Sequence, residues 1–256
     1  MRIVWIASYP KSGNTWVRFL LYNYLYGEVT DSESVHQRIP SVHGEGKDKL
    51  TDPGDGPLLS KTHFMLSPKH PYVDKTAGFI YILRNPKDVL LSNLNFYKIS
   101  SEEDISDEAY ARDFINVMGV RHWRKMGMGS WVEHISSWLS ATVSVPHVML
   151  RYEEMKAAPE ENLERIIRFL GKPVDAGRIA DAVTRSSFDS MRAMETRERE
   201  HGKAGAVFNI KGTAGTDTGK RFLNEGKSGQ SLAHISPEVD ALFDKRFGDV
   251  QRVLGY

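Results

Sequence analysis

The sequence predicts an α/β fold in which a mostly parallel central sheet is flanked by helices. Short apolar runs rich in β-branched and aromatic residues alternate with helical patterns from the first residues to about Leu170. Polar segments directly follow the runs at 3–7, 78–83 and 145–150, and ligands of open parallel sheets bind at such strand ends. No repeat or low-complexity linker divides the 256 residues, so we expect a single domain spanning 1–256.

The composition excludes several classes of protein. A net charge of +1 gives no overall field for nucleic acid, and the absence of cysteine excludes disulfides, thiolate metal sites and cysteine nucleophiles. No uninterrupted apolar stretch is as long as a membrane span, and no basic-then-apolar leader precedes the first strand. We therefore expect a cytoplasmic protein that binds no nucleic acid and does not insert into a membrane.

The first strand–loop–helix unit predicts an anion site. The run at 3–7 is typical of a buried strand, residues 8–14 are turn formers, and apolar side chains then recur at helical spacing. Backbone N–H groups at the start of that helix, with the positive end of its dipole, favour phosphate. Lys11 adds positive charge and Gly13 allows close approach. Short side-chain donors come from Ser12, Asn14 and Thr15.

This loop differs from the common triphosphatase loop, because its lysine precedes the glycine and no Gly-Lys-Ser/Thr follows. An ordinary strand–loop–helix connection is the alternative. The segment Tyr9-Pro10-Lys11-Ser12-Gly13-Asn14-Thr15-Trp16 closely resembles the 5′-phosphosulfate loop of sulfotransferases that use 3′-phosphoadenosine 5′-phosphosulfate (PAPS). The resemblance implies the family's nucleotide-kinase-like fold over nearly the full length. It also implies that the co-substrate binds to Lys11, Ser12, Gly13, Asn14, Thr15 and Trp16.

A second expected strand, at 57–64, carries Lys61-Thr62-His63 at its polar end. Side chains two apart share a strand face, so Lys61 and His63 lie together and suit acid–base chemistry at an anionic site. A lone histidine at a strand end is otherwise a structural residue. The three residues match the Lys-Thr-His segment of the same family, which implies that His63 is the general base and that Lys61 supports the transferring sulfonate.

The expected strand at 78–83 runs into Arg84-Asn85-Pro86-Lys87-Asp88 and a helix. A surface arginine in a salt bridge is the alternative interpretation of Arg84. The segment resembles the family's Arg-Asn-Pro-Lys-Asp element, which implies that Arg84 and Ser92 hold the 3′-phosphate and that Ser92 also bridges to Lys11. A guanidinium suits this task because its planar fork binds phosphate oxygens in pairs.

Two further segments resemble the part of the family that binds the base. Arg151-Tyr152-Glu153-Glu154-Met155 is similar to the family's Tyr-Glu-Asp-Met element, which implies that Tyr152 lies near the adenine. A tyrosine that only packs is the alternative. Ser186-Ser187-Phe188 is similar to the family's Thr-Ser-Phe, which implies that Ser186 and Phe188 line the purine pocket, with serine in place of the usual threonine.

Two stretches compete for the family's C-terminal loop at the 3′-phosphate, 211–215 and 226–230. We prefer 226–230, because the following residues 234–238 keep the family's His-Phe-Thr-Pro-Glu register. Asn224 and Glu225 then replace the family's Arg-Lys pair, as in similar loops of sulfotransferases of bacterial glycopeptide-antibiotic pathways. The residues left for the 3′-phosphate are Gly226, Lys227 and Ser228.

These resemblances predict in-line transfer of the PAPS sulfonate to a hydroxyl (or amine) of a small-molecule acceptor such as a secondary metabolite or glycoside. No metal is expected, because the sequence offers no carboxylate cluster to hold Mg²⁺. A P-loop-like kinase that uses ATP and a catalytically silent nucleotide-binding module are the alternatives, and a homodimer is left open. The acceptor should be defined by the loops 27–56, 98–128 and 192–220.

Overall fold

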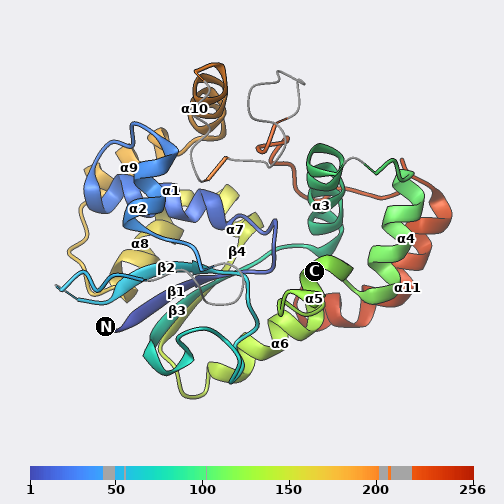
Figure 1. Ribbon diagram of the computed structural model, residues 1–256, viewed down its shortest axis with the longest axis horizontal. Helices are drawn as coiled ribbons and strands as arrows, with labels where there is room; N and C mark the ends of the chain where they lie inside the picture. Colours follow the sequence, from blue (N-terminus) through green and yellow to red (C-terminus); the bar gives the residue numbers. More distant parts are fainter. Residues whose placement is uncertain (43–49, 55, 102, 202–206, 209–220) are drawn as a thin grey trace.

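A four-stranded parallel sheet forms the centre of the protein, which confirms the predicted class. The computed structural model describes residues 1–42, 50–54, 56–101, 103–201, 207–208 and 221–256. The strands are β1 (Ile3–Ala7), β2 (Leu58–Thr62), β3 (Thr76–Leu83) and β4 (His147–Arg151). They lie in the order β2-β1-β3-β4, and every neighbouring pair is parallel (Figure 1). The carboxyl ends of all four strands therefore meet at one edge of the sheet.

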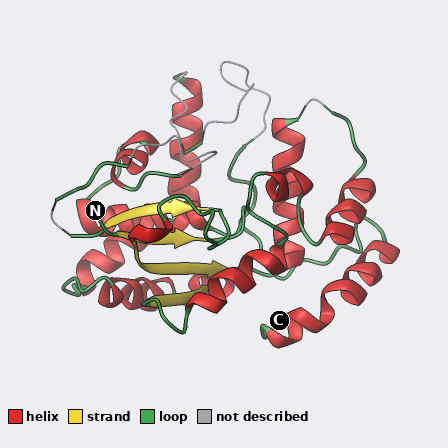
Figure 2. Ribbon diagram, turned by 60° about the horizontal axis from the view of Figure 1, so that its bottom comes forward, coloured by secondary structure: helices red, strands yellow, loops and turns green. Residues whose placement is uncertain are grey.

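Helices follow the strands and cover both faces of the sheet (Figure 2). In chain order the described helices are α1 (Asn14–Tyr26), α2 (Ser32–Arg38), the 3₁₀ helix η1 (Val73–Lys75), α3 (Pro86–Ser100), α4 (Asp107–Val117), α5 (Arg121–Lys125), α6 (Trp131–Ala141), α7 (Tyr152–Ala157), α8 (Pro159–Phe169), α9 (Ala176–Arg185), α10 (Phe188–Glu200) and α11 (Pro237–Val253). None of the helices within these ranges combines the length and apolar character that crossing a membrane requires.

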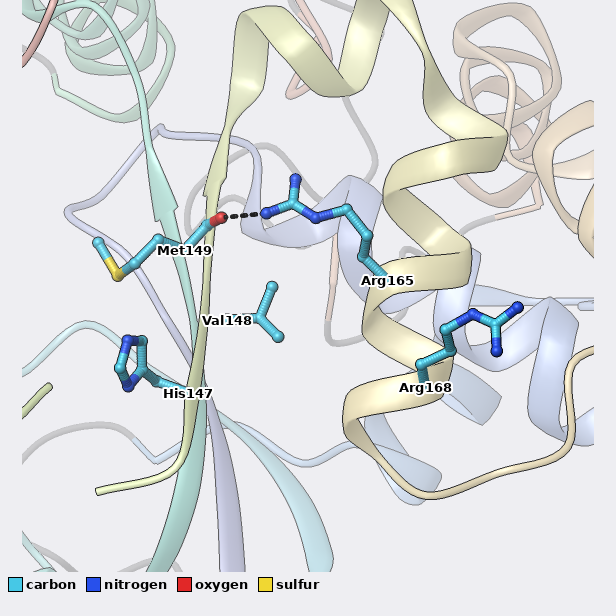
Figure 3. Close-up of a pocket in the computed structure, with 5 residues that line it drawn as sticks. All are labelled: His147, Val148, Met149, Arg165 and Arg168. Atoms are coloured by element: carbon cyan, nitrogen blue, oxygen red, sulfur yellow. Dashed lines mark hydrogen bonds between the residues drawn. The ribbon is translucent and has the colours of Figure 1, made fainter. Parts of the chain in front are cut away.

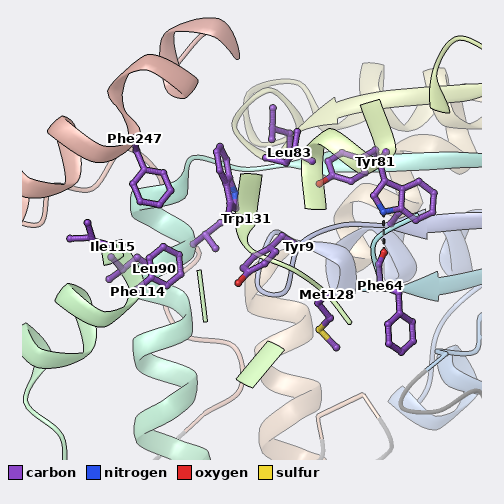
Figure 4. Close-up of a cluster of buried hydrophobic side chains, with 14 of the residues drawn as sticks. Tyr9, Phe64, Tyr81, Leu83, Leu90, Phe114, Ile115, Met128, Trp131 and Phe247 are labelled. Carbon is purple, nitrogen blue, oxygen red and sulfur yellow. Dashed lines mark hydrogen bonds between the residues drawn. The ribbon is translucent and has the colours of Figure 1, made fainter. Parts of the chain in front are cut away.

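Alternation along the strands sends side chains to two separate cores. Trp5 and Phe79 are fully buried on the face covered by α3, α4, α6 and α11, where Figure 4 shows Trp131 and Phe247 packed together. Ile6 and Ile80 are fully buried on the opposite face, against α1, α8 and α9. Burial on both faces explains why these strands are apolar throughout rather than alternating with polar residues. The two cores fix the sheet between the helix layers, so the strand ends form a rigid platform.

Two strands are shorter than the sequence predicts. β2 ends at Thr62, one residue before His63, and β4 ends at Arg151, directly before α7 begins at Tyr152. His63 and Tyr152 thus lie just beyond strands rather than within them. The connecting backbone at the sheet edge, and not the alternation of a strand, therefore sets the direction of their side chains.

Candidate active site

A cavity of about 660 Å³ lies at the carboxyl ends of the strands. Every strand of the sheet delivers side chains to it, as open parallel sheets do at their ligand sites. The predicted site residues that the structure brings together here are Lys11, Gly13, Asn14, Thr15, Trp16, Lys61, His63, Arg84, Ser92, Tyr152, Phe188, Gly226 and Lys227.

Three predicted residues do not line this cavity. Ser12 is buried and its Oγ has no hydrogen-bond partner among the described residues. Ser186 is also buried, and its Oγ accepts a hydrogen bond of 2.9 Å from Asn23 Nδ2, which ties the end of α9 to α1. Ser228 is half-buried outside the lining. The competing stretch 211–215 lies outside the described residues, whereas 226–230 lies at the cavity.

The loop between β1 and α1 has a backbone shaped for an anion. Lys11 and Gly13 have positive φ angles of 71° and 103°, and no side chain caps the start of α1. A Cβ on Gly13 would lie 2.6 Å from Cδ2 of Tyr152, so only glycine fits between that ring and the loop. Asn14 Nδ2 donates to the Ile6 carbonyl at 2.9 Å and closes the turn. The first backbone N–H groups of α1 therefore have no capping side chain and are available to an anion in the cavity.

The Lys11 ammonium is enclosed by two aromatic rings. Its Nζ lies 4.7 Å from the ring centroid of Phe96 and 4.0 Å from that of Phe222. Burial, and to a lesser degree the positive charge of Arg84, lowers the pKa of Lys11 to about 7, while Glu195 acts in the opposite direction. A bound phosphate would oppose these effects and favour the charged form.

His63 is held in one tautomer by the backbone. Its Nδ1 lies 2.7 Å from the carbonyl oxygen of Ser8, which can only accept, so Nδ1 carries the proton and the lone pair is on Nε2. His134, which α6 carries, donates from Nε2 to the His63 carbonyl at 3.1 Å, and the Tyr81 hydroxyl bonds His134 Nδ1 at 2.8 Å. Burial lowers the pKa of His134 to about 3, so this imidazole is neutral. Hydrogen bonds that run from the Tyr81 hydroxyl through the neutral His134 ring to the His63 carbonyl thus fix the backbone at His63.

Arg84 connects the two sides of the cavity. Its guanidinium donates to the carbonyls of Lys11 (2.9 Å) and Lys227 (2.8 Å), and it lies 4.3 Å from the centroid of the Tyr152 ring. Arg84 is 6% exposed, and its Nε has no partner among the described residues. Arg84 therefore links the loop that holds Lys11, the Tyr152 ring and the C-terminal segment that holds Lys227. Its Nε is still available as a hydrogen-bond donor.

Residues 221–230, which we call the cover segment, lie over the cavity and are held from three helices. Asp88 of α3 is fully buried and accepts from Gly229 N (2.9 Å) and from Gln230 N and Nε2 (3.1 Å each). From α10, Glu195 accepts the N–H groups of Phe222 and Leu223, and Arg192 donates to the carbonyls of Leu223 and Asn224. From α7, Lys156 donates to the Gly226 carbonyl at 2.8 Å.

Sequence reasoning missed most of these anchors and the apolar part of the lining. Asp88 was predicted only as a helix-start residue. The lining residues without a prediction include Arg18, Leu91, Phe96, Lys156, Met191 and Phe222. The loops expected to define the acceptor do reach the lining, through Ser41, Trp123, Met126, Met128 and Val207. Arg18 had a usable signal, since it follows Asn14 by four residues and so lies on the same helix face.

A second, shallower hollow lies at the outer edge of β4, lined by His147, Val148, Met149, Arg165 and Arg168 (Figure 3). Its two arginines are engaged, because Arg165 donates to Met149 O and Asn162 Oδ1 and Arg168 pairs with Glu164 at 2.6 Å. The strand-end cavity has the convergent polar groups and is the better candidate. Over the described ranges, no group of three or more His, Cys, Asp or Glu side chains is placed to hold a metal ion.

Comparison with known proteins gives one consistent result. The sulfotransferase domain family matches residues 2–253. Sulfotransferase 2A1 of Macaca fascicularis is 28% identical over 250 residues, covering 94% of this chain and 81% of the relative. Sulfotransferase 1A1 of Mus musculus is 29% identical over 202 residues, covering 74% of this chain and 66% of the relative.

Solved structures share the fold. Mouse sulfotransferase SULT7A1 complexed with PAP has a TM-score of 0.67 at 22% identity, with coverage of 98% of this chain and 85% of that one. Retinol dehydratase in a complex with retinol and PAP has a TM-score of 0.73 at 17% identity, with coverage of 98% and 82%. Since the family match extends over almost the whole sequence, this chain belongs to the sulfotransferase domain family.

Proposed function

We propose that this protein transfers the sulfonate group of PAPS to a hydroxyl (or amine) of a small-molecule acceptor. The observation that carries the proposal is the single strand-end cavity lined by Lys11, His63, Arg84 and Ser92. Two structural neighbours were solved with PAP, which is PAPS without its sulfonate, and this supports the choice of donor.

The donor would lie across the strand ends. In this proposal the N–H groups at the start of α1 and Lys11 bind the 5′-phosphosulfate. Arg84 and Ser92 bind the 3′-phosphate, for which the unpartnered Nε of Arg84 is an available donor. Tyr152 and Phe188 would flank the adenine. Ser186 contributes by holding α9 against α1, since its hydroxyl is already bonded to Asn23.

The transfer itself needs a base and a place for negative charge. In the proposed step, Nε2 of His63 accepts the proton of the acceptor hydroxyl as the oxygen attacks sulfur. The bond from sulfur to the bridging oxygen of the 5′-phosphate breaks, and PAP leaves with the bonding electrons. Lys11 and the α1 N–H groups stabilise the charge on PAP, and Lys61 lies beside the sulfonate. The lysines supply the positive charge, so no metal ion enters the proposal.

Removal of the imidazole tests the base directly. We expect His63→Ala to lower turnover of labelled PAPS by about 10²–10⁴-fold, while the Kd for PAP stays within about threefold of wild type. His234→Ala is the matched control, because this exposed histidine is not part of the cavity lining. Transfer by His63→Ala at near wild-type rate would show that another group takes the proton.

Donor binding separates this function from its two rivals. Calorimetric titration with PAPS, PAP and ATP·Mg²⁺ should give tight binding of the first two and weak binding of the third. Preference for ATP·Mg²⁺ would indicate a kinase, and tight binding without turnover of any acceptor would indicate a silent nucleotide-binding module.

For the acceptor we propose a bacterial secondary metabolite such as a glycopeptide or another glycoside, on the basis of the loop resemblance at 226–230.

A further inference from the structure

The order of the strands sets the order in which the site residues lie along the cavity. Tyr152 follows β4, Arg84 follows β3, Lys11 follows β1 and Lys61 lies in β2, so the order β4-β3-β1-β2 places them in sequence along the sheet edge. Under the proposed function the adenosine end of the donor lies at Tyr152 and the sulfonate reaches Lys61. The wall beyond Lys61, next to His63, is therefore the wall that faces the acceptor.

Arg18 forms part of that wall. It extends from α1, is 2% exposed, and lines the cavity. Its Nη2 donates to the Ile39 carbonyl at 2.6 Å. The segment that carries Ile39 runs along β2, where Lys61 N donates to Pro40 O at 2.8 Å and Ser41 pairs with Lys61. Arg18, Ser41 and Lys61 consequently meet on the β2 side of the cavity, away from Arg84.

Among the described residues, the charge of Arg18 is poorly compensated. Its Nε is buried without a hydrogen-bond partner, and no carboxylate in the described part of the chain forms an ion pair with it. Burial lowers the pKa of Arg18 to about 10, so the guanidinium is still charged at neutral pH. Burial and the positive charge of Arg18 together lower the pKa of Lys61 to about 7. A buried guanidinium with no carboxylate partner among the described residues is costly unless an anion binds it.

We propose that the acceptor carries an oxyanion group, a carboxylate or phosphate type of charge, which binds to Arg18 while the reacting hydroxyl lies at His63. Ser41 lines the same cavity and is bridged to Lys61 through the backbone. This inference rests on the proposed function, because it uses the donor's position to assign the acceptor side. A planar guanidinium binds two oxygens of such a group at once, which a neutral acceptor cannot match.

Matched acceptors test the inference on the full chain. The PAP-saturated protein is titrated with 4-hydroxyphenylacetate, 4-hydroxybenzylphosphonate and the neutral 4-hydroxyphenylacetamide. We expect an anionic compound to bind at least about tenfold more tightly than the amide, and kcat/KM with PAPS to show the same preference. The first two compounds decide between a carboxylate and a phosphate as the group that Arg18 recognises.

Variants then assign the preference to Arg18. Arg18→Met should abolish it, with the Kd for PAP within about threefold of wild type, and Arg18→Lys, which keeps the charge, should retain part of it. Arg168→Met on α8, outside the cavity, is the control and should keep the full preference. Thermal unfolding of each variant checks that α1 still packs, and Arg18→Lys carries the test if Arg18→Met is unstable.

Three outcomes overturn the inference. The first is that the amide binds as tightly as the anions, and the second is that Arg18→Met weakens the binding of all three compounds equally. The third is that Arg18→Met weakens the binding of PAPS but not of PAP, which would assign Arg18 to the donor sulfonate. Failure of the wild-type protein to bind PAP is a different result, since it contradicts the proposed function itself.

Discussion

The two sides of the cavity are built in different ways. The strand-end side consists of the Lys11 loop, Lys61, His63 and Arg84, and its backbone is continuous with four paired strands. The cover segment, 221–230, has no helix or strand of its own. It is held by side chains of α3, α7 and α10 that bond its backbone.

This difference separates what the fold fixes from what individual side chains fix. On the strand-end side a substitution changes the backbone geometry only if it disturbs a short loop between rigid elements. On the cover side, removal of one anchor releases several backbone groups together. We expect the strand-end side to set the chemistry and the larger part of the donor affinity, and the cover segment to contribute a smaller part of that affinity.

The largest effect is expected where the strand-end side has least space. Gly13→Ala would combine a φ of 103° with a Cβ 2.6 Å from the Tyr152 ring. The loop or the ring must move. A shift of the loop removes N–H groups from the 5′-phosphate site, and a shift of the ring disturbs the end of the site that Tyr152 flanks in the proposal. We expect a loss of about 100-fold in PAP affinity, equivalent to about 3 kcal/mol, in calorimetric titrations.

Gly27→Ala at the other end of α1 is the matched control. Gly27 has a similar φ of 93°, but nothing lies within 4 Å of its added Cβ. This variant should lose stability in urea through backbone strain while it keeps PAP affinity. Equal losses of PAP affinity in both variants would mean that strain alone, and not contact with Tyr152, makes Gly13 necessary.

A smaller but more localised effect is expected on the cover side. Asp88→Ala leaves three donors of Gly229 and Gln230 without their acceptor. We expect PAP affinity to fall by about 20-fold, with faster amide exchange in 221–230 and unchanged exchange at Ile6. Asp249→Ala, at an exposed pair with Arg252, is the control. Unchanged exchange in 221–230 would show that the other anchors suffice.

Sequence reasoning succeeded where a few consecutive residues determine the geometry. The apolar run at 3–7, the turn formers after it and the helical spacing from residue 15 together define a strand, a loop and a helix. The fold and the family were therefore predictable, and so was the gathering of Lys11, His63 and Arg84 at one edge. That gathering follows from parallel strands alone.

Long-range contacts were not predictable in this way. The hydroxyl of Ser186 bonds Asn23, 163 positions earlier in the chain, and Lys11 lies against Phe222. Glu195, which holds Phe222 in place, appears in the sequence as one acidic residue of an ordinary charged helix. No local period predicts such pairs, because they depend on how α9 and α10 pack against the rest of the molecule.

The protonation of Lys11 gives a further way to distinguish the two sides. Its pKa of about 7 in the free protein lies below the ordinary value of 10.5, so above pH 7 PAP must bind together with a proton. We expect PAP affinity to fall by about fivefold between pH 7 and 8, with proton uptake in calorimetry across buffers of different ionisation enthalpy.

The same shift has the opposite effect on stability. The unfolded lysine stays protonated up to about pH 10.5, so between pH 7 and 10.5 the unfolded state holds more protons than the free folded state. The contribution of Lys11 to the free energy of unfolding therefore rises with pH over this window. Lys11→Met should remove the trend in PAP affinity and lessen the trend in stability, to which Lys61 contributes as well. A pH-independent PAP affinity in the wild type would contradict the lowered pKa of Lys11.

The smallest effect is expected from the carboxylate on the cover segment. Glu225 pairs with Lys227 at 2.8 Å, and both line the cavity, so the carboxylate competes with phosphate for the ammonium. Both side chains are more than half exposed, which limits the effect. We expect Glu225→Gln to tighten PAP binding about twofold at low salt and to have no effect at 0.5 M salt, where exposed charges are screened. Glu164→Gln, in the exposed pair with Arg168 on α8, should leave PAP affinity unchanged at either salt concentration. Weaker PAP binding by Glu225→Gln would mean that the carboxylate orders the cover segment, and the cover side would then depend on its own charges as well as on the anchors from α3, α7 and α10.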